Sequence, residues 1–278
     1  MGPHPISVKC YGSTEVSKTL GEGSTPSTGA SFQMKVVKMN VILTMTTVPN
    51  RMEHSLKKSV NRILDMPEDF ELHINIPKVQ ASTEEEYIIP KWLKEISNPK
   101  LKIFDDVEDL GPRTKLIPTL LRVSNNSILI TVDDDVVYRN GMISYHLDLR
   151  KKYPDDVTGF AGVGEDGKYY TSVKDNVNVA VLENYKTVSY NRSFFEKDFF
   201  EKYLDKSWND DIITACYFRD KKRNKVVVKY EQETYFSPRV ISFPIASLIE
   251  TDFGGCDLFR NDSRKNTFTE ILDQYNRV

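Results

Sequence analysis

The chain has 278 residues, a length that allows one large α/β domain or two small ones, and 39% of the residues are hydrophobic, which is enough for a substantial core. Its 38 Lys and Arg residues nearly balance its 40 Asp and Glu residues, so the composition argues against a polybasic nucleic-acid-binding protein and against an acidic tail. The three cysteines are far apart and form no CxxC pair, so we expect no zinc site and no disulfide framework. There is no apolar run of the roughly 20 residues that a membrane span needs, so we expect a cytoplasmic protein without a membrane span.

The start of the chain differs in composition from the rest. Residues 1–34 are dense in Gly, Ser, Thr and Pro and show no sustained periodicity, so we expect a flexible or artificially added leader. Residues 35–278 are expected to form a single domain. Four strands are predicted in its first half: residues 34–45, 71–77, 100–106 and 127–132. Helices are predicted between them: one beginning near Met52, one at residues 83–96 with an interruption at Pro90, and one at residues 111–123.

The second half of the chain is less regular. Its predicted elements are a helix at residues 140–153, an extended segment at 176–192, a largely helical segment at 193–222 with a break around Ser207 and Trp208, and a strand at 224–230. The alternation of strands and helices favours an α/β fold with a mainly parallel, Rossmann-like sheet flanked by helices.

Three consecutive carboxylates, Asp133, Asp134 and Asp135, follow the strand predicted at residues 127–132. Adjacent carboxylates repel one another, so a positive group is expected beside them. Ligands of open parallel sheets bind at the C-terminal ends of the strands, and a continuing strand would turn Asp133 and Asp135 to one face and Asp134 to the other. Two carboxylates on one face suit Mg²⁺ or Mn²⁺, whose shell is completed by water and substrate phosphate. The alternative is a solvated acidic turn.

These residues resemble the DxD motif of nucleotide-sugar glycosyltransferases of the GT-A fold, which ends an apolar strand. The resemblance runs from about Lys35 to Lys229 and includes "TTVPNR" after the first strand, "DLGPRTKLIPTL" before the acidic strand, "VVY" after it and "SWNDDI" later. The chain looks similar to the branch found in bacterial surface-polysaccharide enzymes and in large algal viruses that glycosylate their own capsids. A viral member would act in the host cytoplasm.

The resemblance implies transfer of a sugar from a nucleoside diphosphate, often UDP, with the nucleotide bound by residues 35–138 and the acceptor by residues 139–278. It implies that Asp135 binds the metal directly and that Asp133 contacts the ribose or reaches the metal through water. The other donor-binding residues would be Thr46, Thr47, Pro49, Arg51, Lys115 and Asp134. Many relatives add a late histidine ligand, but the four histidines of this chain come early, so the third protein ligand stays unassigned.

Two of these assignments have plain alternatives. The Thr-rich turn after the first strand can offer hydroxyl and N–H groups to a nucleotide, but such a turn is equally a helix cap. Lys115 can neutralise phosphate or pair with Asp106, and a surface lysine is the commoner explanation of any single lysine.

A second acidic pair, Asp210 and Asp211, stands at the predicted start of a helix, where acids are favoured and where Asn209 or Asp210 would make a good cap. In the family an acidic pair at this point carries the catalytic base of an inverting reaction, and the alignment favours Asp211, with Asp210 second. Acceptor contacts are expected from Trp208, which is equally well explained as a core residue, and from Glu183.

The leading hypothesis is therefore a metal-dependent, inverting glycosyltransferase that uses a UDP-sugar and a glycan or glycoprotein acceptor. A sugar nucleotidyltransferase is the second, but it usually needs a Gly-rich loop after the first strand, and "TTVPNR" has no glycine. The third is a non-catalytic transferase-like domain that binds a glycan or a partner. The sequence does not identify the donor sugar, linkage, stereochemical course or oligomeric state.

Overall fold

The structure, a computed structural model, describes residues 39–138, 140–171, 173–207, 209–229 and 272–277. They belong to one compact unit that starts at Lys38. The expected leader, Trp208 and most of the tail after residue 229 lie outside the described residues. The division of the domain into nucleotide-binding and acceptor-binding halves stays a prediction.

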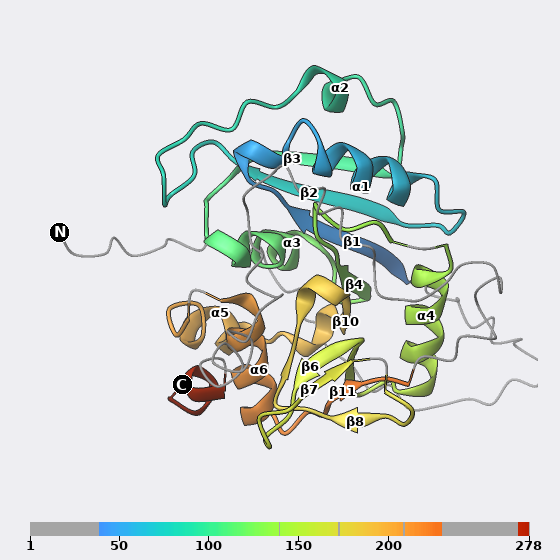
Figure 1. Ribbon diagram of the computed structural model, residues 1–278, viewed down its shortest axis with the longest axis vertical. Helices are drawn as coiled ribbons and strands as arrows, with labels where there is room; N and C mark the ends of the chain where they lie inside the picture. Colours follow the sequence, from blue (N-terminus) through green and yellow to red (C-terminus); the bar gives the residue numbers. More distant parts are fainter. Residues whose placement is uncertain (1–38, 139, 172, 208, 230–271, 278) are drawn as a thin grey trace, which may run out of the picture. The chain divides into compact units, whose positions relative to one another are not determined.

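An eight-stranded sheet with the strand order β3-β2-β1-β4-β10-β5-β11-β8 forms the centre of this unit (Figure 1). Its strands are β1 (Asn40–Thr46), β2 (Glu71–Pro77), β3 (Leu101–Val107), β4 (Ser127–Thr131), β5 (Val157–Gly159), β8 (Val177–Asn178), β10 (Val188–Asn191) and β11 (Lys225–Val227). The first four are mutually parallel, β5 pairs parallel with β11, and β10 runs antiparallel to both β4 and β5. This topology confirms the α/β class and the mainly parallel sheet.

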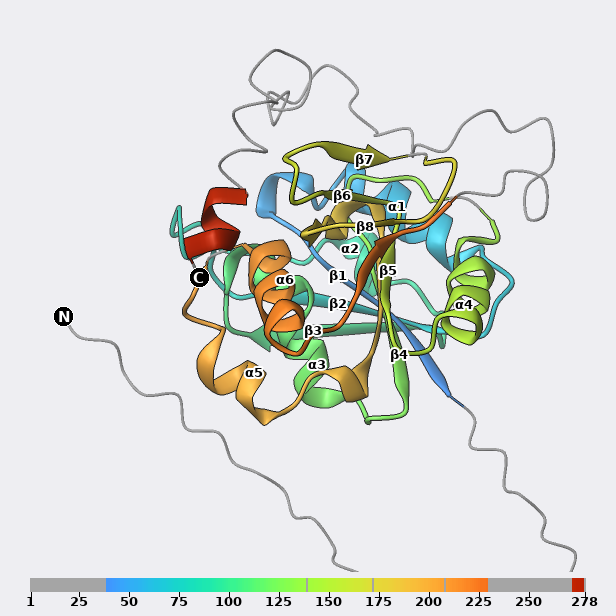
Figure 2. The same ribbon diagram turned by 90° about the horizontal axis from the view of Figure 1, so that it is seen from below.

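A second sheet of three short strands, β6 (Ala161–Val163), β7 (Tyr169–Thr171) and β9 (Val181–Leu182), has the order β7-β6-β9. Its strands β6 and β7 lie near β8 of the large sheet in both views (Figures 1 and 2). Gly162 allows the close pairing of β6 with β9, because a Cβ atom at this position would collide with the Val181 carbonyl oxygen.

Helices flank the large sheet, as the sequence predicts. The α-helices are α1 (Ser55–Leu64), α2 (Lys91–Lys94), α3 (Ile117–Arg122), α4 (Met142–Lys152), α5 (Lys197–Lys202) and α6 (Asp210–Asp220), and residues 272–277 are also helical. The 3₁₀ helices are η1 (Pro49–Arg51), η2 (Gly111–Lys115), η3 (Asn184–Lys186) and η4 (Arg192–Phe194). None of the helices in the described ranges is both long enough and apolar enough to cross a membrane.

Both faces of β1, β2 and β4 are buried, which explains the apolar runs of these strands, whereas β3 at the edge of the sheet is partly exposed. On β4, Ile128 and Ile130 pack into the cluster that includes Leu56 of α1, whereas Leu129 between them packs into a second cluster with Phe199 of α5. All five residues of β4 are buried, the polar Ser127 and Thr131 among them, and the charged residues come only after the end of the strand.

One predicted helix is wrong. In place of a helix over residues 83–96 there is only the four-residue α2, because Pro90 caps its start instead of interrupting a longer helix. The residues before Pro90 form a turn closed by a bridge between Val79 and Glu86, with Glu84 at a φ of +58°. This turn reaches the rim of the candidate site.

Candidate active site

The candidate site lies at the C-terminal ends of β1 and β4, two neighbouring parallel strands. The chain continues from β1 to β2 on one side and reaches β4 on the other, so this is the point where the strand order reverses and where open α/β sheets bind ligands. A cavity of about 280 Å³ opens there. Six of the predicted site residues line it: Thr46, Thr47, Arg51, Lys115, Asp133 and Asp134. The other predicted residues in the described ranges do not line this cavity: Pro49, which lies in η1, Asp135, Glu183, Asp210 and Asp211.

The three carboxylates form a turn instead of continuing the strand. β4 ends at Thr131, and the Asp133 N–H donates to Tyr138 Oη at 2.6 Å, which bends the chain back. The expected separation of Asp133 and Asp135 from Asp134 by strand alternation therefore does not apply. Instead Asp134 and Asp135 share one cation, since Arg51 Nη1 lies 2.9 Å from the first and 3.1 Å from the second.

Asp134 joins the acidic turn to the segment after β1. This residue is 3% exposed, and its carboxylate accepts hydrogen bonds from Thr47 Oγ1 at 2.6 Å and from Arg51 at 2.9 Å. Burial raises the pKa of Asp134 to about 6, against the opposing effect of the Arg51 charge. The Thr-rich turn thus holds a buried carboxylate in place.

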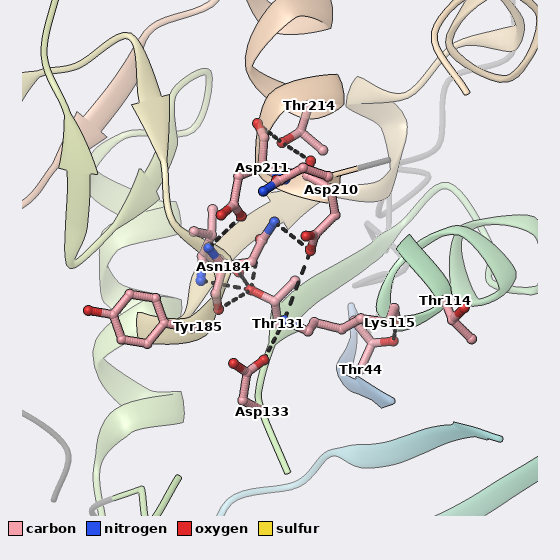
Figure 3. Close-up of polar contacts among 12 residues, drawn as sticks. Thr44, Thr114, Lys115, Thr131, Asp133, Asn184, Tyr185, Asp210, Asp211 and Thr214 are labelled. Carbon is pink, nitrogen blue, oxygen red and sulfur yellow. Dashed lines mark hydrogen bonds and ion pairs between the residues drawn. The ribbon is translucent and has the colours of Figure 1, made fainter. Parts of the chain in front are cut away.

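Lys115 joins the acidic turn to the second acidic pair (Figure 3). Its Nζ forms an ion pair with Asp133 and lies 3.9 Å from Asp210 Oδ2, and its side chain is 9% exposed. Burial alone would lower the pKa of Lys115, but the charges of Asp133 and Asp210 raise it above its ordinary value. The ammonium group therefore stays charged, with these acids as its partners and not Asp106.

A buried amide fixes the backbone of Lys115. Asn75 Nδ2 on β2 donates to the carbonyl oxygens of Thr114 at 3.0 Å and Lys115 at 3.1 Å, and Thr44 Oγ1 on β1 also donates to the Lys115 carbonyl. The end of η2 is thereby anchored to the two central strands, and the lysine side chain reaches across to α6.

The second acidic pair stands at the start of α6, as predicted. Asn209 is the cap, because its Oδ1 accepts from the N–H groups of Asp211 at 2.7 Å and Ile212 at 3.3 Å. Asp210 Oδ2 accepts from Asn184 Nδ2 at 3.0 Å, and Asp211 Oδ1 accepts from the Asn184 backbone N–H at 2.8 Å. Burial raises the pKa of both carboxyls, and for Asp211 the charges of Asp210 and Glu183 raise the pKa further.

Glu183 directly precedes Asn184, whose backbone N–H donates to Asp211, and the charge of Glu183 raises the pKa of Asp211. Glu183 is 4% exposed, burial raises its pKa to about 7, and its Oε2 atom accepts no hydrogen bond from the residues that the structure describes. Trp208, the other predicted acceptor residue, falls outside those residues.

Several residues of the site were not predicted. Asn184 binds both acids, and Tyr87 and Asp109 line the cavity. Asp109 Oδ1 accepts from Gly111 N–H at 2.8 Å, and its Oδ2 accepts from Ala81 N–H at 2.7 Å, so it ties the turn before Pro90 to η2. No local pattern distinguishes Asn184 from other asparagines, whereas Asp109 stands in the "DLGPR" stretch that already carried the resemblance.

No family model matches the chain, and no curated protein matches it. Among solved structures, Staphylococcus aureus TarS 1-349 is 13% identical over 56% of this chain, with a TM-score of 0.40. This chain covers 48% of that one, or about half its length. The 4-diphosphocytidyl-2C-methyl-D-erythritol synthase of Anaerococcus prevotii is 13% identical over 66% of this chain and 85% of its own, with a TM-score of 0.43. Likenesses at this level carry no argument about function.

Proposed function

We propose that this protein is a metal-dependent glycosyltransferase that moves a sugar from a nucleoside-diphosphate sugar, UDP being the first nucleotide to test, to a hydroxyl of a glycan or glycoprotein. One observation carries the proposal. Two carboxylate groups from distant parts of the chain, Asp133 to Asp135 and Asp210 with Asp211, are joined through Lys115 beside a cavity at the switch point of the sheet.

The cavity suits a diphosphate because two cations line it. Arg51 uses Nη1 for both of its carboxylate contacts, so its Nη2 and Nε groups can serve phosphate oxygens. Lys115 offers a second positive charge on the Asp133 side. Tyr87, from the turn before Pro90, and Thr46 also line the cavity, so an aromatic ring and a hydroxyl are available to the nucleoside.

The donor set also fits Mg²⁺ or Mn²⁺. The side chains of Asp135 and Asp133 are 33% and 20% exposed, so these hard oxygens can reach an ion that takes its other ligands from water and phosphate. Asp135 would hold the ion directly and Asp133 through water, and the bound ion would supply positive charge to the departing diphosphate. Within the described ranges no group of three or more His, Cys, Asp or Glu residues is arranged to hold a metal, so no third protein ligand is assigned.

Asp211 is the better general base of the acidic pair. Asp210 is 4% exposed and is occupied by Asn184 and Lys115, whereas Asp211 is only partly buried. An ionised Asp211 takes the proton of the acceptor hydroxyl while the hydroxyl oxygen bonds to the anomeric carbon, and the bond from that carbon to the diphosphate breaks with its electron pair leaving on the diphosphate. A pKa of Asp211 raised by burial makes it a stronger base near neutral pH.

The first test is calorimetric binding of UDP and GDP, each with and without Mn²⁺. Binding of one nucleotide that depends on Mn²⁺ and is lost in Asp135→Ala would support the donor class, with Asp105→Ala, an exposed aspartate on β3, as the matched control. Failure of both nucleotides to bind the native protein would overturn a UDP or GDP donor. Release of pyrophosphate from a nucleoside triphosphate and a sugar phosphate would favour a nucleotidyltransferase instead.

The assignment of Asp211 has its own test. We expect Asp211→Asn to bind the nucleotide within about twofold of the native protein and to lose about 10²- to 10⁴-fold in transfer rate, the usual share of a general base. Transfer at the native rate in this variant would refute the assignment.

A further inference from the structure

Asn184 donates a hydrogen bond to the carboxylate of each member of the second acidic pair. It is 1% exposed and begins η3, which follows β9. Its side-chain Nδ2 donates to Asp210 at 3.0 Å, and its backbone N–H donates to Asp211 at 2.8 Å. One neutral residue therefore supplies a hydrogen bond to each of two adjacent carboxylates.

The amide of Asn184 has a fixed orientation. Its Oδ1 accepts from the hydroxyls of Tyr190 at 2.8 Å and Thr131 at 3.0 Å. If the amide were reversed, its oxygen would face the Asp210 carboxylate, which accepts hydrogen bonds only when ionised. The two hydroxyls thus turn the donor end of the amide toward Asp210. Figure 3 shows the contacts of Asn184 with Thr131 and Asp210.

The turn that carries Asn184 also contacts helix α4. It ends at Thr187, which is fully buried and has a φ of +63°, a value that a β-branched residue rarely adopts. Thr187 Oγ1 lies 2.7 Å from His146 Nε2 of α4, and both residues are 0% exposed. Such a conformation persists only where the surroundings enforce it, so the position of Asn184 is set by α4 as well as by β4 and β10.

We propose that Asn184 is the positioning residue of the acidic pair: its two donors hold Asp210 against Lys115 and direct Asp211 to the acceptor. This inference rests on the proposed function for the role of Asp211, but not for the contacts themselves. The donors favour the charged form of each carboxylate, as hydrogen bonds to an anion do.

Several charged or titratable groups face this pair and share control of it. They are Lys115 at the end of η2, Asp133 after β4, Glu183 before η3 and Tyr190 on β10. Lys115 favours the ionised pair, whereas Asp133 and Glu183 oppose it. Replacing Asn184 by an acid would add one more opposing charge next to Asp210.

The test is Asn184→Asp, which keeps the shape of the side chain, together with Asn184→Ala. The protonation of Asp210 and Asp211 is followed by the pH dependence of their ¹³C carboxyl NMR signals, which requires no activity. We expect the macroscopic pKa values of the pair to rise by about one unit in Asn184→Asp and by less in Asn184→Ala. In transfer assays the acid limb of the pH–rate profile should move up by the same amount, which lowers the rate at pH 7 by up to about tenfold, and Mn²⁺-dependent nucleotide binding should stay within twofold.

Asn61→Asp makes the same chemical change at an exposed position of α1 and should alter none of these measurements. If Asn184→Asp does not fold, Tyr190→Phe is the second variant. It removes only a hydroxyl that orients the amide and keeps the ring packed near Phe195 and Phe218. It should raise the macroscopic pKa values of the pair by a smaller amount. Unchanged carboxyl titrations in folded variants would overturn the inference. Shifted titrations in a protein that binds no nucleotide would leave it standing and overturn the proposed function instead.

Discussion

Lys115 offers the sharpest test of how the site is held together. Lys115→Met removes the charge from a side chain that is 9% exposed and leaves Asp210, with a side chain 6% exposed, facing Asp133 without a cation between them. Removing one partner of a buried ion pair usually costs about 3–5 kcal/mol. We expect the lower end, about 3 kcal/mol in the free energy of unfolding at pH 7, because the Asp133 side chain is 20% exposed and keeps part of its hydration.

The loss in Lys115→Met should depend on pH in one direction. The pKa values of Asp210 and Asp211 are already raised by burial in the native protein, and loss of the lysine charge raises them further. A carboxyl whose pKa is higher in the folded state than in the unfolded state, where it is about 4, stabilises the fold while it is protonated. This contribution is complete below the unfolded-state pKa and is lost as the pH rises through the folded-state pKa. The deficit should therefore be small near pH 4 and reach its full size above neutral pH. The raised pKa of Lys115 itself has effect only at alkaline pH.

Urea unfolding of the native protein and Lys115→Met at several pH values measures this deficit. Lys91→Met is the control, because Lys91 is 87% exposed and pairs at 3.5 Å with an exposed Glu95, so its loss should cost about 0.5 kcal/mol or less. A cost below about 1 kcal/mol for Lys115→Met at pH 7, or a cost equal at pH 4.5 and pH 7.5, would refute the reasoning.

Two further predictions concern the surroundings of the acidic pair. Burial raises the pKa of Glu183 from 4.5 to about 7, so the free energy of unfolding of the native protein should fall as the pH rises through this range. In Glu183→Gln this fall should be smaller by up to about 3 kcal/mol, because the neutral side chain does not ionise. Identical pH profiles of unfolding in the two proteins would contradict it. Asn209→Ala removes the cap of α6 and should lower the free energy of unfolding by about 1 kcal/mol in urea titrations, whereas an unchanged value would mean that the cap contributes nothing.

The strands of the parallel half were predictable because each is a buried apolar run that ends at turn residues. β2, for example, spans Glu71–Pro77, as predicted from the sequence. The strands β5 to β7 were missed because each has three residues, too few to show a period, and their pairing depends on distant partners such as Leu182 for Gly162. The false helix before Pro90 arose from apolar spacing that a tertiary turn overrides.

The site was predictable in its acids but not in their partners. Repulsion among Asp133, Asp134 and Asp135 indicates that positive charge is needed, yet it does not say which group supplies it. The structure supplies it from Arg51 after β1 and from Lys115 in η2. The sequence suggested Arg51 for the donor, and Lys115 for the donor or for pairing with Asp106. Strand alternation also failed there, because the side-chain hydroxyl of Tyr138 ends the extended backbone. Such contacts join residues far apart in the chain, so no local pattern records them.

Arg51 and Lys115 pair with carboxylates in the free protein and are also the cations proposed to bind the diphosphate. In the free protein Arg51 is held by Asp134 and Asp135, and Lys115 by Asp133, so the groups that would receive a diphosphate and those that would hold a divalent ion neutralise one another. A nucleotide alone can reach Nη2 and Nε of Arg51, but the charges of both cations are already neutralised by their carboxylates, and Mn²⁺ alone must compete with Arg51 for Asp135. Binding of Mn²⁺ to the carboxylates releases the cations for the diphosphate, and binding of the diphosphate to the cations releases the carboxylates for Mn²⁺. The two ligands should therefore bind cooperatively. By linkage, each ligand must increase the affinity for the other by the same factor, whichever is added first. Calorimetric titrations in both orders measure this factor; we expect about 5- to 150-fold, and a factor of one would show that the ion pairs do not oppose binding.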